Sequence, residues 1–212
     1  MISGLFSHLA IGLAVSFVGS VPPGAINLTA VKISLEKGYR AVLNFALAAA
    51  LVEFFYGLLA VYGARFLAAH EYLTRGLDYI TAVVFLGLGL YYTFGKSQAP
   101  EVAGEEAQTK ALSSATPFVK GLTLGIFNPL CVPFWLAYTS FLQTRQWIHL
   151  QPATTLCYVT GIAAGAFVAL SLFGLLSRWI NDNLQLSTHV INRTIGIILI
   201  GLSLFKWVGM WW

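Results

Sequence analysis

The stretch Ser20-Val-Pro-Pro-Gly-Ala-Ile-Asn27 interrupts an otherwise apolar segment near the start of the chain. Pro22 and Pro23 remove two backbone donors and clash with the preceding turn, so a regular helix cannot continue through them. Gly24 adds backbone freedom, and Asn27 places an amide in apolar surroundings. The stretch therefore predicts a helix that breaks part of the way through.

A second interruption, Asn128-Pro129 with Pro133 close behind, lies in the second half of the chain. A proline leaves the carbonyl four residues earlier without its amide partner, so free carbonyls are predicted at Val18, Gly19, Gly125 and Pro129. Bare backbone groups cost several kcal/mol in lipid and must be met by protein, water or a ligand. A kink that only shapes packing, or an interhelical hydrogen bond made by Asn128, remains open as the alternative.

The composition of the chain indicates an integral membrane protein. Its 212 residues are 58% hydrophobic and 9% charged, whereas soluble domains average about 25% charged residues. The net charge of +4 comes without a basic run or any module that binds nucleic acid. Cys131 and Cys157 lie in apolar segments without metal-ligand spacing and are predicted to be small buried hydrophobes.

Six spans are predicted, because a bilayer core takes roughly 20 apolar residues per helix. They cover residues 4–31, 41–63, 76–95, 118–142, 153–176 and 189–210. The first is too long for one straight helix, which agrees with a break or a strong tilt. The expected fold is an all-α integral membrane protein with a single membrane domain, residues 1–212.

A polar linker, residues 96–117, has too few apolar residues to fold alone and separates two three-helix halves, 1–95 and 118–212. Three is an odd number, so the second half enters the membrane from the opposite face. This predicts an inverted-topology repeat with broken first and fourth helices. Leu-Gly-Leu-Gly-Leu at 86–90 resembles Ile-Gly-Leu-Ser-Leu at 200–204, although chance likeness between apolar runs stays open.

Basic residues are concentrated in alternate loops. The positive-inside rule then places these loops in the cytoplasm and both termini outside. Most of the 12 Lys and Arg residues follow spans one, three and five: Lys32, Lys37, Arg40, Lys96, Lys110, Lys120, Arg178 and Arg193.

Glu53 is the only acidic residue near the middle of a predicted span. Its charge would cost about 2.5–3.5 kcal/mol in lipid even on a lenient insertion scale. Ala46, Ala50 and Gly57 share its helix face, so Glu53 is predicted to point into the bundle as a proton carrier or the counter-ion of an ammonium group. A protonated Glu that only binds a freed carbonyl is the alternative. Four bulky residues about 100° away are predicted to face lipid: Leu47, Leu51, Phe54 and Leu58.

Three further groups of residues have a possible role in packing or binding. Trp135 and Tyr138 follow the second break and are candidates to line a cavity, with ordinary core packing as the alternative. Gly161 and Gly165 form a small-xxx-small pair that predicts tight helix packing. No metal or cofactor is expected, and the histidines lack ligand spacing: His8, His70, His149 and His189.

Several runs resemble the lysine-exporter family (LysE/RhtB type). Val-Pro-Pro-Gly-Ala-Ile-Asn-Leu-Thr-Ala-Val at 21–31, followed by Glu-Lys-Gly at 36–38, resembles that family's first helix. Phe-Val-Lys-Gly-Leu at 118–122, Phe-Asn-Pro at 127–129 and Phe-Trp-Leu at 134–136 resemble its fourth. Six spans, the linker and the chain length also agree, so the resemblance covers essentially the whole chain.

This resemblance implies an exporter of amino acids or similar small metabolites in the cytoplasmic (inner) membrane of a prokaryote, driven by an ion gradient, with H⁺ expected as the coupling ion. Family members commonly carry Pro-Gly-Pro in the first helix. Here Ala25 replaces the second proline and Ile26 is apolar, so a basic substrate does not follow. We expect alternating access, with Glu53 coupling transport to the proton. The expected substrate-binding residues are Pro22, Pro23, Gly24, Asn27, Asn128, Pro129 and Trp135.

Two other function classes remain open. One is a structural or partner-binding membrane subunit without transport activity. The other is a membrane-embedded enzyme, which is disfavoured because the chain has no His-Glu-x-x-His cluster and no nucleophile with a nearby base at mid-depth. An ATP-driven pump lacks support because Gly-x-x-x-x-Gly-Lys is absent. The transported molecule, the stoichiometry and the oligomeric state, a homo-oligomer included, are left open by the sequence.

Overall fold

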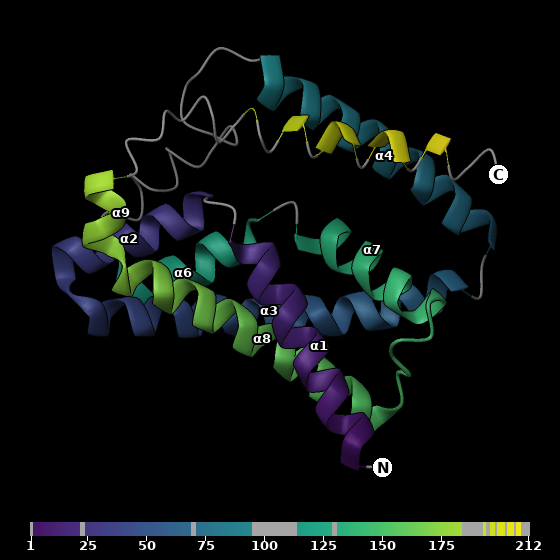
Figure 1. Cartoon of the computed structure of the whole chain (residues 1–212), viewed down its shortest axis with the longest axis horizontal. Helices are drawn as coiled ribbons and strands as arrows, with labels where there is room; N and C mark the ends of the chain where they lie inside the picture. The colour runs from purple at the N-terminus through teal and green to yellow at the C-terminus, as the bar shows by residue number, and fades with distance from the viewer. Residues whose placement is uncertain are drawn as a thin grey trace.

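A computed structural model describes residues 2–21, 24–68, 71–94, 114–128 and 131–183, with 193, 196–197, 199–201, 203–205 and 207–208. All regular secondary structure within these residues is helical (Figure 1). The helices are α1 (Ile2–Ser20), α2 (Ala25–Lys37), α3 (Tyr39–Ala68), α4 (Glu71–Phe94), α6 (Pro117–Ile126), α7 (Cys131–Thr144), α8 (Pro152–Leu175) and α9 (Ser177–Asn183). The described residues from 193 to 208 are also helical.

Both predicted interruptions are present, and each divides one predicted span into two helices. The axes of α1 and α2 differ by 81°, and those of α6 and α7 by 65°. Within the described chain, Tyr39–Phe66 of α3 and Pro152–Leu175 of α8 are long and apolar enough to cross a membrane unbroken. Each bent pair can supply one further span, which gives up to four. Most of the predicted linker, and much of the sixth predicted span, lie outside the described residues.

The helix α1 packs along α8, and their backbones come into direct contact. Gly161 and Gly165 of α8 face the carbonyl oxygens of Leu9 and Leu13 so closely that neither has room for a Cβ. Gly12 of α1 fits against α8 in the same way. The predicted packing role of the Gly161–Gly165 pair is therefore confirmed.

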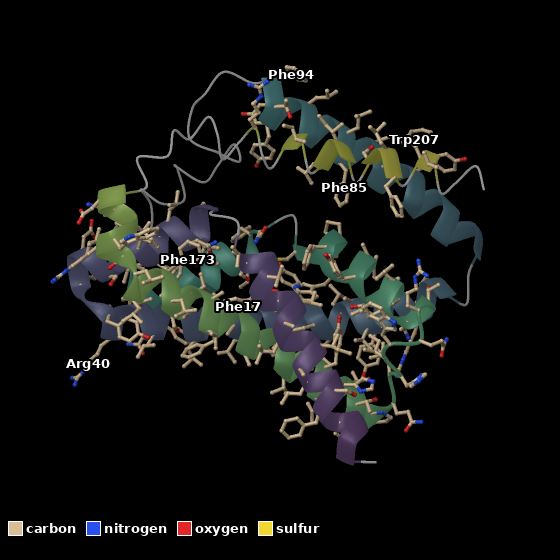
Figure 2. The ribbon with its side chains drawn as sticks, in the orientation of Figure 1. Phe17, Arg40, Phe85, Phe94, Phe173 and Trp207 are labelled. Atoms are coloured by element: carbon tan, nitrogen blue, oxygen red, sulfur yellow. The ribbon has the colours of Figure 1, made fainter. Side chains whose placement is uncertain are left out.

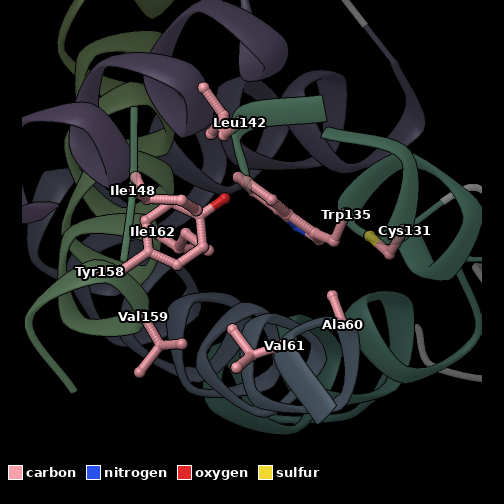
Figure 3. Packing of buried hydrophobic residues seen from close by; sticks show 9 residues of the cluster. All are labelled: Ala60, Val61, Cys131, Trp135, Leu142, Ile148, Tyr158, Val159 and Ile162. Atoms are coloured by element: carbon pink, nitrogen blue, oxygen red, sulfur yellow. The ribbon is translucent and has the colours of Figure 1, made fainter. Parts of the chain in front are cut away.

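A second close contact joins α6 to α3. Gly121 faces the carbonyl oxygen of Phe45, again without room for a Cβ, and Gly125 packs against the side chain of Val52. By contrast, α3 meets α8 through side chains, with Gly57 facing Val159. A buried apolar cluster fills the space between α3, α7 and α8 (Figure 3): Ala60, Val61, Cys131, Trp135, Leu142, Ile148, Tyr158, Val159 and Ile162.

The lipid-facing stripe on α3 differs in part from the prediction. Leu47 and Leu51 are exposed as expected, and the small face at Ala46, Ala50 and Gly57 is buried. The expectation for Phe54 and Leu58 was wrong, because both pack against the core cluster. The exposed stripe instead continues in steps of four residues, through Phe55 and Leu59.

The helix α4 pairs with the helical residues near the end of the chain, and the pair lies beside the other helices (Figures 1 and 2). Gly89 packs against Ile200, which places the two similar runs at 86–90 and 200–204 in contact. The hydroxyl of Ser203 donates to the Ala82 carbonyl at 2.8 Å. The Trp207 ring meets Tyr79 edge to face.

Candidate functional site

The first break ends α1 at Ser20, and its carbonyl is bound by a side chain beyond the break. Asn27, 3% exposed, donates from Nδ2 to the Ser20 oxygen at 2.8 Å. The predicted free carbonyl at Val18 was wrong, because a tighter turn lets the Val21 amide donate to it at 3.2 Å. Gly24 is the extended N-cap residue of α2. Pro22 and Pro23 lie outside the described residues.

The second break ends α6 at Ile126, and here too a side chain binds the last carbonyl. The Tyr56 hydroxyl of α3 donates to the Ile126 oxygen at 2.6 Å. The predicted free carbonyl at Gly125 was wrong, because the Asn128 amide donates to it at 3.2 Å. The Asn128 carbonyl accepts from the Cys131 amide at 3.3 Å and so leads into α7. Pro129 lies outside the described residues.

The two breaks are stabilised by the same kind of hydrogen bond. In each, the last carbonyl of the first half-helix receives a hydrogen bond from a side chain on another helix. Such carbonyls lack intrahelical partners and would be costly if they faced lipid. The interruptions can therefore persist at membrane depth without exposing these two oxygens.

Glu53 lies directly beside the start of α7. The Trp135 indole nitrogen donates to Oε2, and the Cys131 thiol donates to Oε1 at 3.2 Å. Trp135 is 2% exposed and Cys131 is 7% exposed. The predicted inward direction of Glu53 agrees with these contacts. Cys131 is buried in the core cluster as predicted, and its thiol also binds the carboxyl group of Glu53, whereas Cys157 is only partly buried.

The carboxyl group of Glu53 is bound by two neutral donors. No Lys, Arg or His side chain within the described part of the chain lies within ion-pair distance of it; the ion pair seen there joins Lys32 to Glu36 on α2. An enclosed carboxylate without a counter-ion is costly, so a proton or an ammonium group would be stabilised beside it. Trp135 acts here through Glu53, since its only ring donor is already bound.

Phe134 connects the two breaks. Its ring packs against Gly19, one residue before the end of α1, where a Cβ would meet the ring. The same ring contacts Trp135 edge to face, with centroids 5.0 Å apart. The structure therefore brings Glu53, Cys131 and Trp135 together beside the second break. Asn27 binds within the first break, and Phe134 links the two.

Sequence reasoning missed Tyr56, Cys131 and Phe134. One signal for Tyr56 was available, because it lies three residues after Glu53 and so shares its helix face. The thiol of Cys131 and the ring of Phe134 gain their roles only from contacts between distant segments. No local pattern identifies such contacts.

His8 was also missed, and it joins α1 to the loop before α8. It is 4% exposed, and its Nε2 accepts from the His149 amide at 2.8 Å. Its Nδ1 lies 2.5 Å from the Gly4 carbonyl and donates to it. The partners are separated by most of the chain, so the sequence carries no sign of this contact.

Comparison with known proteins identifies the family of this chain. A family model described as LysE type translocator matches residues 17–207, a range that includes both breaks and Glu53. Neither the curated proteins nor the solved structures gave a match. The family match covers most of the chain and agrees with its apolar helices and with the resemblance seen in the motifs. The chain therefore belongs to the family of LysE type translocators.

Proposed function

We propose that this protein is a secondary active transporter that exports amino acids or related small metabolites across the cytoplasmic membrane of a prokaryote by alternating access. Membership of a translocator family supports membrane transport of a small molecule and argues against an enzyme. The ion coupling, the alternating access and the direction of transport belong to the proposal and do not follow from family membership.

One observation carries the proposal, namely that Glu53 lies beside a broken span without a cationic partner in the described chain. A proton bound at its Oε1 or Oε2 would neutralise it. The ammonium group of an amino acid would do the same. Both possibilities give Glu53 a role in a cycle that alternates between loaded and empty states.

The breaks supply the complementary chemistry for a carboxylate. The half-helices α2 and α7 begin just after the breaks, so the positive dipole end of each attracts an anion, and the amino-terminal amides of α2 add hydrogen-bond donors. The N-cap residue of α2, Gly24, has no side chain to occupy those amides. We place the substrate carboxylate near Pro22, Pro23, Gly24 and Asn27 on one side. On the other side, we place the substrate near Asn128 and Pro129, where Trp135 acts through Glu53.

The placement of basic residues supports the proposed orientation. The helix α2 meets the start of α3 and α9 at one end of the molecule, where Figure 2 labels Arg40. We place that end in the cytoplasm and both termini outside. Arg65 lies in the last turn of α3, and Arg145 directly follows α7. The basic residues on the proposed cytoplasmic end are Lys32, Lys37, Arg40, Lys120 and Arg178.

Helix contacts support an inverted repeat of two three-helix units. In the first unit the broken span packs through α1 on α8, which is the middle helix of the second unit. In the second unit the broken span packs through α6 on α3, the middle helix of the first. Glycines make close contacts in both pairs. A two-fold relation between the units accounts for this exchange of partners.

Reconstituted transport tests the proposal. Purified protein in liposomes should exchange a labelled amino acid by counterflow, and overproducing cells fed dipeptides should release particular amino acids. Glu53→Gln should abolish gradient-driven efflux while the protein still inserts. Glu36→Gln, which removes an exposed carboxylate from α2, is the matched control and should leave efflux unchanged.

The exchange reaction separates the two roles of Glu53. If Glu53→Gln loses gradient-driven efflux but keeps exchange, the residue carries the proton. If both are lost, it holds the ammonium group. Unchanged efflux in this variant would remove Glu53 from the mechanism, and absence of counterflow for every amino acid tried would overturn the assignment of substrate class.

A further inference from the structure

Tyr56 takes no part in the proposed binding of cargo or proton, yet it is bound at the second break. Glu53 and Tyr56 project from one face of α3, three residues apart. Tyr56 donates to the carbonyl of Ile126, the last residue of α6. Glu53 accepts from Cys131 and Trp135 on α7. One face of α3 therefore binds both sides of the same break, through two different side chains.

The two sides of the break are attached to α3 in different ways. On the α6 side, Gly121 brings the backbones of α6 and α3 into contact, and Tyr56 adds its bond at the end of the helix. On the α7 side, attachment comes from the Glu53 carboxylate and from side-chain packing, such as Leu136 against Gly63. The α6 side therefore depends more on backbone contact, and the α7 side more on a carboxylate.

A proton on Glu53 affects these attachments unequally. Hydrogen bonds to an ionised carboxylate are stronger than those between neutral groups. When Oε1 takes a proton, the Cys131 thiol can no longer donate to it and can only accept, and sulfur is a weak acceptor. The Tyr56 bond joins a phenol to a main-chain carbonyl, and neither partner changes charge. The titratable groups that interact with Glu53 in the described chain are Cys131 and Tyr56.

We propose that Tyr56 is a positioning residue that holds the end of α6 on α3, so that protonation of Glu53 loosens α7 alone and changes the angle between α6 and α7. This inference rests on the proposed function in one respect, that Glu53 takes up a proton during the cycle. Movement of α7 relative to a fixed α6 would then be the step that alternates access at this break.

Distances between spin labels test the inference without any cargo. In a Cys157→Ala background, one label pair joins exposed Leu59 of α3 to exposed Val119 of α6. The other joins exposed Leu47 of α3 to exposed Phe141 of α7. Between acidic and alkaline pH, the α3–α7 distance should shift and the α3–α6 distance should not. Glu53→Gln should hold the α3–α7 pair at its acidic distance under both conditions.

Tyr56→Phe is the decisive variant, because it removes one hydroxyl and keeps the ring. Its α3–α6 distance distribution should broaden and become pH-dependent, and its efflux rate should fall roughly fivefold, the effect of one hydrogen bond. Tyr62→Phe, at an exposed position on the same helix, is the matched control and should match the wild type in both measurements.

Three results would overturn the inference. One is an α3–α6 distance in Tyr56→Phe that equals the wild-type distance at both pH values. The second is a wild-type α3–α6 distance that shifts with pH as much as the α3–α7 distance. The third is a pH response that survives Glu53→Gln. Counterflow that fails while the labels respond as expected refutes the transport proposal only, and the reverse pattern refutes this inference only.

Discussion

At Glu53, the partner side chain determines whether a hydrogen bond persists when the carboxyl group takes up a proton. Trp135 can only donate, so it binds Oε2 whether or not the carboxyl group carries a proton. The thiol of Cys131 donates to Oε1 while that oxygen is unprotonated, and can only accept weakly once the oxygen carries a proton. Protonation of Oε1 therefore keeps the Trp135 bond and weakens the Cys131 bond.

Removing the Cys131 thiol should impair transport more than exchanging it for a hydroxyl. Cys131→Ala leaves Oε1 without its donor, and we expect efflux to fall roughly threefold to tenfold. Cys131→Ser keeps a donor and should retain most activity. Initial efflux rates from proteoliposomes measure both, with Cys157→Ala as the control. Equal rates for the Ala and Ser variants would mean that the thiol does not act through Glu53.

Asn27 stabilises the first break through the carbonyl of Ser20. Asn27→Ala leaves that partly buried acceptor without its bond, at a cost of about 1–3 kcal/mol. The midpoint of thermal unfolding in detergent should therefore fall. Asn44→Ala, on the exposed face of α3, should leave the midpoint unchanged. A midpoint for Asn27→Ala equal to the wild-type value would show that the carbonyl finds another partner.

At the scale of the helix, the positions of glycines determine which pairs of helices pack with their backbones in contact. Gly165→Ala places a Cβ against the backbone of α1 near Leu13, and overpacking of this kind costs about 1–3 kcal/mol. The unfolding midpoint should drop. Gly4→Ala on α1 is the matched control, because a Cβ there meets nothing within 4 Å. Loss of stability in the control as large as in Gly165→Ala would refute the packing argument.

Local patterns predicted the breaks and the buried small face of α3, because proline geometry and helical period are properties of a short segment. These patterns failed where contacts with a distant segment determine the partner or the burial of a residue. The carbonyls of Val18 and Gly125 accept hydrogen bonds from backbone amides in tight turns. The carbonyls that side chains bind are instead those of Ser20 and Ile126. Phe54, predicted to face lipid, is partly buried against the neighbouring core cluster instead.

At the scale of the molecule, α7 has to move relative to α3 if the cycle proceeds as proposed. Gly63 of α3 and Leu136 of α7 are in contact, so cysteines at both positions should form a disulfide under oxidation. We expect oxidised Gly63→Cys/Leu136→Cys to lose nearly all efflux and to regain it on reduction. The single variants Gly63→Cys and Leu136→Cys control for the substitutions. Efflux that persists in the cross-linked protein would exclude this motion.

The contrast between the glycine-lined pairs and the α3–α8 contact has a consequence for how such a molecule can deform. Two helices whose main chains touch at a glycine cannot slide without steric collision, so α1 with α8, and α6 with α3, behave as two stiff blocks. The blocks meet where α3 lies on α8 through side chains such as Val159, and side chains can repack by changing rotamers. Movement of one block against the other should therefore occur as a shear along that boundary, while the interior of each block stays intact and α7 moves separately.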